Sequence, residues 1–153
     1  MAGIGAQEYR DGANERLQDA LVLLREERFA GAIYLGGRAV EAMLRAIIWR
    51  TDREYATGKK SLETGHDIRE MLLLVKNLGL LRRDLVHESV ANDVQKVARL
   101  WWNNMRYFPN RKVESLWYDV GEIGRRRTMK QAATQYYEAC SNIIKRCEAL
   151  WQD

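Results

Sequence analysis

The chain has 153 residues, of which 46% are hydrophobic and 30% charged, and it carries a net charge of +4 with a pI of about 9.2. This length fits one domain over residues 1–153, and the single proline and the scarcity of alternating apolar and polar runs argue against a β fold. No apolar run approaches the roughly 20 residues that span a bilayer, and the N-terminus lacks the apolar core of a secretory signal, so we expect a cytoplasmic protein.

The first two expected helices follow each other closely. We expect residues 1–8 to be loosely ordered and a helix to run from about Tyr9 to Arg28. Apolar residues recur there on one stripe, at Tyr9, Ala13, Leu17, Leu21 and Leu24. Only a short turn separates this helix from the next apolar repeat, and such a link makes two helices antiparallel neighbours.

A long central helix is predicted by the stretch from Gly31 to Arg50, which reads GAIYLGGRAVEAMLRAIIWR and should end near Arg53. Gly36 and Gly37 lie inside it, and each costs about 1 kcal/mol against alanine. A helix without side chains at two positions lets another helix come close, whether from this chain or from a dimer mate. We therefore predict that these two glycines form an interface.

Two further helices are expected in the middle of the chain. Thr64 and Asp67 fit a capping box at the start of a third helix that stops at Gly79. Residues 80–87 form a short connection. A fourth helix should then run to Pro109, because the residue before a proline is pushed out of the helical region. Its expected inward residues are Val90, Val94, Val97, Trp101 and Met105.

The C-terminal part is predicted to contain a long connection over residues 110–127 and a last helix. Thr128 and Gln131 fit a second capping box. Cys140 and Cys147 lie seven residues apart on this helix, or about 10 Å, which is too far for a disulfide. We expect both to be reduced core residues. The predicted fold is an all-α, up-and-down bundle of about five helices.

Three short phrases resemble the HEPN domain family (higher eukaryotes and prokaryotes nucleotide-binding). One is similar to the second helix of that family, and it consists of Ala32, Tyr34, Leu35, Gly37, Ala39, Val40, Glu41, Leu44, Arg45 and Ala46. Residues 65–69 resemble the His-Asp-Leu phrase that starts the third helix. Residues 106–109 resemble the Arg-Tyr-Pro phrase after the fourth helix, with Phe108 inserted. The resemblance covers roughly residues 9–151.

This resemblance implies a small stand-alone binding protein, a homodimer that acts beside a small nucleotidyltransferase in a toxin–antitoxin-like pair. Two alternatives stay open. One is a metal-independent endoribonuclease of the HEPN toxin type, and the other is a dimeric interaction module without a nucleotide ligand. We expect no cofactor and no metal, because no phosphate-binding loop or metal-ligand spacing occurs in the sequence.

The ribonuclease alternative has one candidate pair, Arg82 and His87. HEPN ribonucleases carry an arginine, a polar residue, a short spacer and a histidine. Arg82 and His87 fit the spacing, but Arg83 stands where the family usually has Asn, Asp or His. The pair also falls in the connection before the fourth helix. We interpret it in the first place as a solvated basic turn, so we favour no catalytic residue.

A ligand-binding surface is predicted where basic and aromatic residues alternate after the fourth helix. Arginine beside aromatic rings suits a phosphate, a nucleobase or a partner protein. The simpler interpretation is that the connection packs its own aromatic residues over the end of the bundle. The predicted ligand-binding residues are Arg106, Tyr107, Arg111, Arg125, Arg126 and Arg127.

Overall fold

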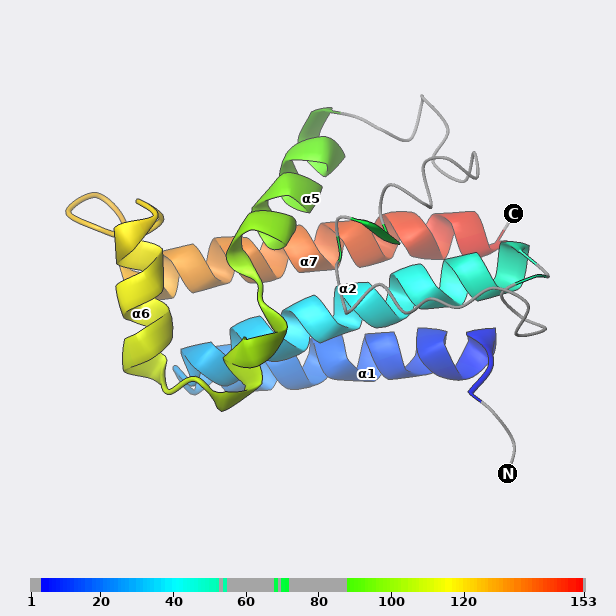
Figure 1. Ribbon diagram of the computed structural model, residues 1–153, viewed down its shortest axis with the longest axis horizontal. Helices are drawn as coiled ribbons and strands as arrows, with labels where there is room; N and C mark the ends of the chain where they lie inside the picture. Colours follow the sequence, from blue (N-terminus) through cyan, green and yellow to red (C-terminus); the bar gives the residue numbers. More distant parts are fainter. Residues whose placement is uncertain (1–3, 53, 55–67, 69, 72–87, 153) are drawn as a thin grey trace.

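The computed structural model describes residues 4–52, 54, 68, 70–71 and 88–152. Within these residues it contains five α-helices, one 3-10 helix and no strand. Helices α1 (Ala6–Arg25) and α2 (Phe29–Thr51) form an antiparallel hairpin, and α7 (Met129–Gln152) runs beside α2 in the same direction (Figure 1). The predicted all-helical bundle is therefore confirmed.

Two shorter helices complete the bundle. Helix α5 (Glu88–Leu100) packs across α7, and the 3-10 helix η1 (Asn103–Tyr107) leads from α5 to α6 (Asn110–Asp119). Helix α6 lies across the end of the molecule where α1 ends and where α2 and α7 begin (Figure 1). The two chain termini lie toward the opposite end. No helix among the described residues is both long and apolar enough to cross a membrane.

The first helix begins and ends earlier than the apolar stripe predicted. It starts at Ala6 because the Glu8 carboxylate accepts a hydrogen bond from the Gly5 backbone N–H at 3.0 Å. It ends at Arg25 because Glu27 adopts a left-handed backbone with φ of 57°. The Arg28 N–H then donates to the Leu23 carbonyl oxygen at 2.8 Å, which closes the turn. The short link and the antiparallel pairing are as predicted.

Helix α2 is the centre of the core, as its sequence predicted. It buries 13 of its 23 residues, and it packs against α1 and α7. Ile33, Val40, Leu44 and Ile47 are each at most 3% exposed. The helix ends at Thr51, close to the predicted end. Burial of this many aliphatic side chains at 1.5–3 kcal/mol each is the main stabilising contribution of the helix.

The last helix begins with the predicted capping box. The Gln131 backbone N–H donates to Thr128 Oγ1 at 3.1 Å, and the Thr128 N–H donates to Gln131 Oε1 at 3.0 Å. Cys140 and Cys147 are free thiols in the core. Burial raises the pKa of Cys147 to about 12 and that of Cys140 further.

The third predicted helix lies mostly outside the described residues. Its capping box, its stop at Gly79 and the connection over residues 80–87 all fall there. Two residues within its predicted range, Ile68 and Met71, are described, and both are buried.

Two predictions in the C-terminal half need correction. The fourth helix ends at Leu100 and does not continue through Trp101 to Met105, because Trp102 has an extended backbone with φ of −132° and ψ of 142°. The segment 110–127 is also more than a connection, since α6 occupies Asn110–Asp119. Val113 and Trp117 are one helical turn apart and buried, which gives this helix an apolar face.

Candidate functional site

Trp101 fixes the point where the chain leaves α5. The indole Nε1–H of Trp101 donates a hydrogen bond to the Tyr34 carbonyl oxygen at 3.1 Å, and the two rings stack with centroids 6.3 Å apart. Gly37 lies beneath this indole, where a Cβ would overlap the ring atoms. Trp101 is therefore seated on α2 in a place that only glycine leaves open.

The two glycines predicted to form an interface are packed within this chain. Gly37 contacts the Trp101 side chain, and a Cβ at Gly36 would lie 3.3 Å from Cys140 Sγ and 3.4 Å from Tyr136 Cε1 on α7. Both glycines are buried. The predicted close approach is thus made inside one chain, and a role of these glycines in a dimer stays a prediction.

Helix α6 is held to the end of the bundle by its inner face. Asn110 Oδ1 accepts a hydrogen bond from the Ala30 backbone N–H of α2 at 2.9 Å. Trp117 is fully buried, its Nε1–H donates to the Leu100 carbonyl oxygen at 3.4 Å, and its ring lies 5.6 Å from that of Tyr136. These contacts leave the outer face of α6 exposed.

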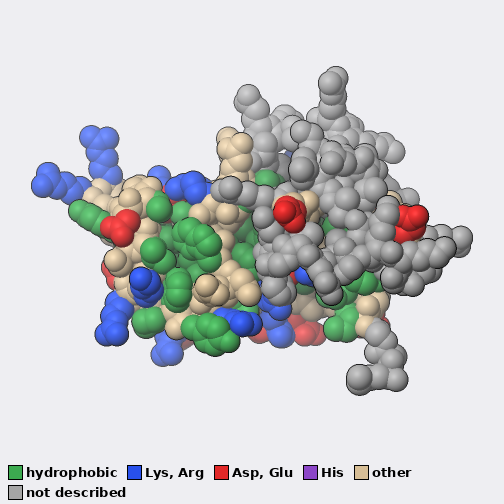
Figure 2. Space-filling model, viewed as in Figure 1, with side chains coloured by type: hydrophobic (Ala, Val, Ile, Leu, Met, Phe, Trp, Pro, Cys, Tyr) green, Lys and Arg blue, Asp and Glu red, His purple; other side chains and the backbone are tan. Residues whose placement is uncertain are grey.

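We call the exposed region around η1 and α6 the α6 surface, and we define it by Trp102, Arg106, Tyr107, Arg111 and Tyr118. Tyr107 is 73% exposed, and the Arg106 guanidinium lies over its ring at 4.6 Å. Arg111 and Tyr118 share one face of α6, because they are seven residues apart. Figure 2 shows hydrophobic and basic side chains side by side at this end of the molecule.

The triple arginine lies at the other end of α6 from Arg106. Arg125 and Arg126 are exposed in the loop after α6, whereas Arg127 binds the buried carboxylate of Glu122 at 3.1 Å. Arg99 of α5 binds the same carboxylate at 2.7 Å. A helix of ten residues is about 15 Å long. The structure thus brings Arg106 and Tyr107 into contact and places Arg111 close after them in the chain, at the start of α6. It sets Arg125 and Arg126 at the far end of α6 and gives Arg127 a structural contact.

A groove between α1 and α2, which the sequence did not predict, has a volume of about 760 Å³. The Glu41 side chain is buried at its wall, and its carboxylate binds Arg38 at 2.7 Å and Arg45 at 3.3 Å. Both arginines follow the helical spacing of three and four residues from Glu41, which is the one signal in the sequence that could have located this cluster. Tyr9, Tyr34 and Arg16 also line the groove.

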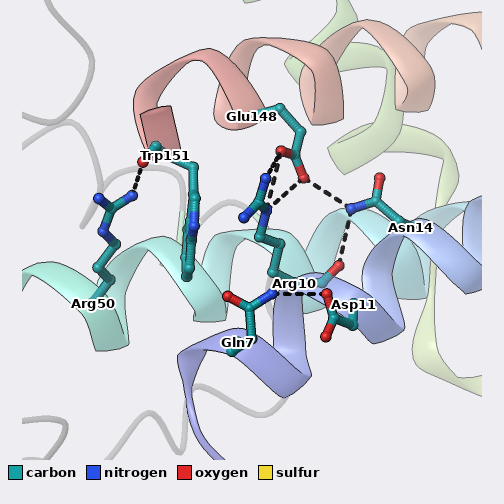
Figure 3. Close-up of polar contacts among 7 residues, drawn as sticks. All are labelled: Gln7, Arg10, Asp11, Asn14, Arg50, Glu148 and Trp151. Atoms are coloured by element: carbon teal, nitrogen blue, oxygen red, sulfur yellow. Dashed lines mark hydrogen bonds and ion pairs between the residues drawn. The ribbon is translucent and has the colours of Figure 1, made fainter. Parts of the chain in front are cut away.

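A second cluster joins α1, α2 and α7 near the chain termini (Figure 3). Glu148 accepts hydrogen bonds from Arg10 Nε at 2.9 Å and from Asn14 Nδ2 at 2.8 Å. The pKa of Glu148 is lowered, chiefly by the hydrogen bond from Arg10. The Trp151 ring lies between the guanidinium groups of Arg10 and Arg50, at 4.9 and 4.5 Å from its centroid.

The catalytic candidates cannot be placed on this framework. Arg82 and His87 both lie outside the described residues. In the part of the chain that the structure describes, no group of His, Cys, Asp or Glu side chains could hold a metal ion.

Comparison with known families decides the identity of the fold. The HEPN domain model matches residues 6–150. The chain belongs to the HEPN family. The match extends from the start of α1 almost to the end of α7, so one HEPN domain covers nearly the whole chain. No curated protein and no solved structure shows significant similarity to this HEPN protein.

Proposed function

We propose that this HEPN protein acts by binding, as the companion of a small nucleotidyltransferase in a toxin–antitoxin-like pair. HEPN proteins often pair with nucleotidyltransferases, and this pairing motivates the proposal. The observation that carries it is the exposure of Trp102, Tyr107 and Tyr118 on the α6 surface at 40%, 73% and 66%. Exposed Trp and Tyr beside Arg is the composition of binding hot spots in protein interfaces.

The rest of the described surface offers less for a partner. Ile4 and Val22 are exposed large hydrophobic residues, but each lies alone, Ile4 just before α1 and Val22 within it. Isolated exposed aliphatic residues are normal and need no partner. We also propose a homodimer, as the family resemblance implies. Nucleotide or RNA binding at the same surface remains a further option within this proposal.

Co-purification with a nucleotidyltransferase from the adjacent gene tests the proposal. The tagged enzyme should retain this chain through size-exclusion chromatography. Tyr107→Ala should weaken the complex by more than about tenfold, which corresponds to a hot-spot cost above about 1.4 kcal/mol. Ile4→Ala serves as the matched control, because Ile4 is 61% exposed and lies just before the start of α1, at the end of the molecule opposite to α6.

Two results would contradict the proposal. One is that no adjacent gene encodes a nucleotidyltransferase, or that the enzyme does not retain this chain. The other is a complex that Tyr107→Ala and Ile4→Ala affect equally, since the α6 surface would then not be its interface. Circular dichroism of each variant checks that its fold is unchanged.

A further inference from the structure

The excess positive charge of this protein is confined to one segment. Residues 99–127 contain seven basic and three acidic side chains, so their net charge of +4 equals that of the whole chain. The remaining residues are neutral in sum. This segment comprises the end of α5, η1, α6 and the following loop, and it includes the α6 surface.

Most of these cations are not used to stabilise the fold. Arg99 and Arg127 are the exceptions, because both bind the buried Glu122 carboxylate within the fold. The other basic side chains of the segment form no ion pair with any residue that the structure describes, and all are exposed. These five are Arg106, Arg111, Lys112, Arg125 and Arg126.

The aromatic side chains determine what kind of partner fits this charge. The Arg106 guanidinium already covers one face of Tyr107, so that face is not open for stacking a base. Glu114 is exposed on α6 three residues after Arg111, on the same side of the helix. A continuous phosphate backbone along α6 would be repelled there, whereas a protein can place its carboxylates beside the arginines and avoid Glu114.

We propose that the α6 surface is a docking site for an acidic protein surface. Carboxylates of the partner bind Arg106 and Arg111, and apolar side chains pack against Tyr107 and Tyr118. Arginine suits this role because its planar guanidinium binds carboxylates through two parallel hydrogen bonds. The inference deepens the proposed function and rests on it in naming the chemistry of the partner's surface.

A peptide probe tests this chemistry without the nucleotidyltransferase. The probe is a short fluorescein-labelled peptide in which Glu alternates with Leu, and its counterpart has Gln in place of Glu. Fluorescence anisotropy at low salt should show at least about tenfold tighter binding of the acidic peptide. Added salt should weaken that binding, because exposed charges are screened.

Variants assign the binding to the α6 surface. Arg106→Gln combined with Arg111→Gln should weaken acidic-peptide binding by about tenfold, and Tyr107→Ala should also weaken it. Lys145→Gln should leave it unchanged, because Lys145 is an exposed cation on α7, outside the charged segment. Circular dichroism verifies that each variant is folded.

Several outcomes would overturn the inference. These are equal binding of the two peptides, equal loss in the Lys145→Gln variant, and binding of single-stranded oligouridine without binding of the acidic peptide. A nucleotidyltransferase complex that forms but is insensitive to Arg106→Gln and Arg111→Gln would also overturn it, and would leave the proposed function standing. Failure of the complex alone would remove only the proposed function.

Discussion

At the scale of single residues, Gly37 and Trp101 depend on each other. The indole occupies the space that any side chain at position 37 would need, and its Nε1–H is bonded to the Tyr34 carbonyl oxygen. A larger residue at position 37 would clash with the indole, and a smaller residue at position 101 would leave a cavity. Gly36 is less constrained, because its nearest neighbours are a thiol and a ring edge at ordinary or slightly short distance.

A graded series of glycine substitutions tests this dependence. Gly37→Ala should lower the free energy of unfolding by about 3 kcal/mol, because the new methyl overlaps Trp101. Gly36→Ala should change it by less than about 1 kcal/mol. Gly12→Ala should raise it by about 0.5–1 kcal/mol, because no atom lies within 4 Å of the added Cβ and alanine favours the helix. Urea denaturation measures all three.

Equal urea midpoints of unfolding for the Gly37→Ala and Gly12→Ala proteins would contradict the packing seen at Trp101. The same samples test the predicted dimer role of the glycines. A Gly37→Ala protein that stays folded but elutes as a smaller species would place this residue in an intermolecular contact as well as in the core.

At the scale of elements, the sequence predicts the long helices better than the connections between them. The periodicity of α2 and α7 continues over more than twenty residues each, so local pattern and tertiary packing agree. Trp101 fits the apolar repeat of α5, yet its indole packs on Gly37 of α2, which lies 64 positions earlier in the chain. Sequence spacing therefore cannot show that the helix must end before it.

Helix α6 and the α1–α2 groove were missed for different reasons. In α6 only Val113 and Trp117 are buried, and exposed Tyr118 directly follows Trp117, so the short helix shows little apolar period. Residue type alone does not separate exposed Trp102 and Tyr118 from their buried neighbours Trp101 and Trp117. In the groove, charged pairs along a helix are common, so Arg38, Glu41 and Arg45 carry little signal alone.

The contact between α1 and α7 should depend on pH through Glu148. The Arg10 hydrogen bond lowers the folded-state pKa of Glu148. Its stabilisation is therefore fully present above the unfolded pKa of about 4.3 and is lost as pH falls through the lower folded value. Glu148→Gln should cost about 1 kcal/mol at neutral pH. The difference from wild type should shrink below about pH 4.

Thermal or urea denaturation of both proteins across this pH range measures the effect. Glu15→Gln is the control, because Glu15 is exposed and its one described ion pair, with Arg16, is long at 3.5 Å. Glu15→Gln should change the free energy of unfolding by less than about 0.5 kcal/mol, because exposed ion pairs contribute little. A constant difference between Glu148→Gln and wild type down to acid pH would show that the cost does not come from the charge.

At the scale of the whole molecule, three long helices join two ends of different composition. One end holds the termini and the Arg10–Glu148–Trp151 cluster, which stabilises the bundle (Figure 3). The other end holds α6 (Figure 1), which belongs to the segment 99–127 with its net charge of +4, and Figure 2 shows Lys and Arg side chains at this end. Binding at α6 therefore need not disturb the cluster that joins the helices.

The same arrangement bears on catalysis, for which we predict a negative result. Metal-free RNA cleavage needs a base near the 2′-hydroxyl and a cation at the phosphate. The α6 surface supplies arginines but no base suited to neutral pH, since tyrosine has a pKa near 10. The two histidines of the chain, His66 and His87, both precede α5 in the sequence. A surface of this composition can bind a partner but cannot take up the proton.

RNA incubated with the purified protein, without added metal, should therefore remain intact. The comparison that decides is wild type against His87→Ala, with Arg82→Ala as a second variant because Arg82 would have to hold the phosphate. RNA cleavage by the wild type that disappears in both variants would establish the ribonuclease alternative. Cleavage that persists in both variants would show that Arg82 and His87 do not form the site, because this chemistry needs both the base and the cation at the phosphate.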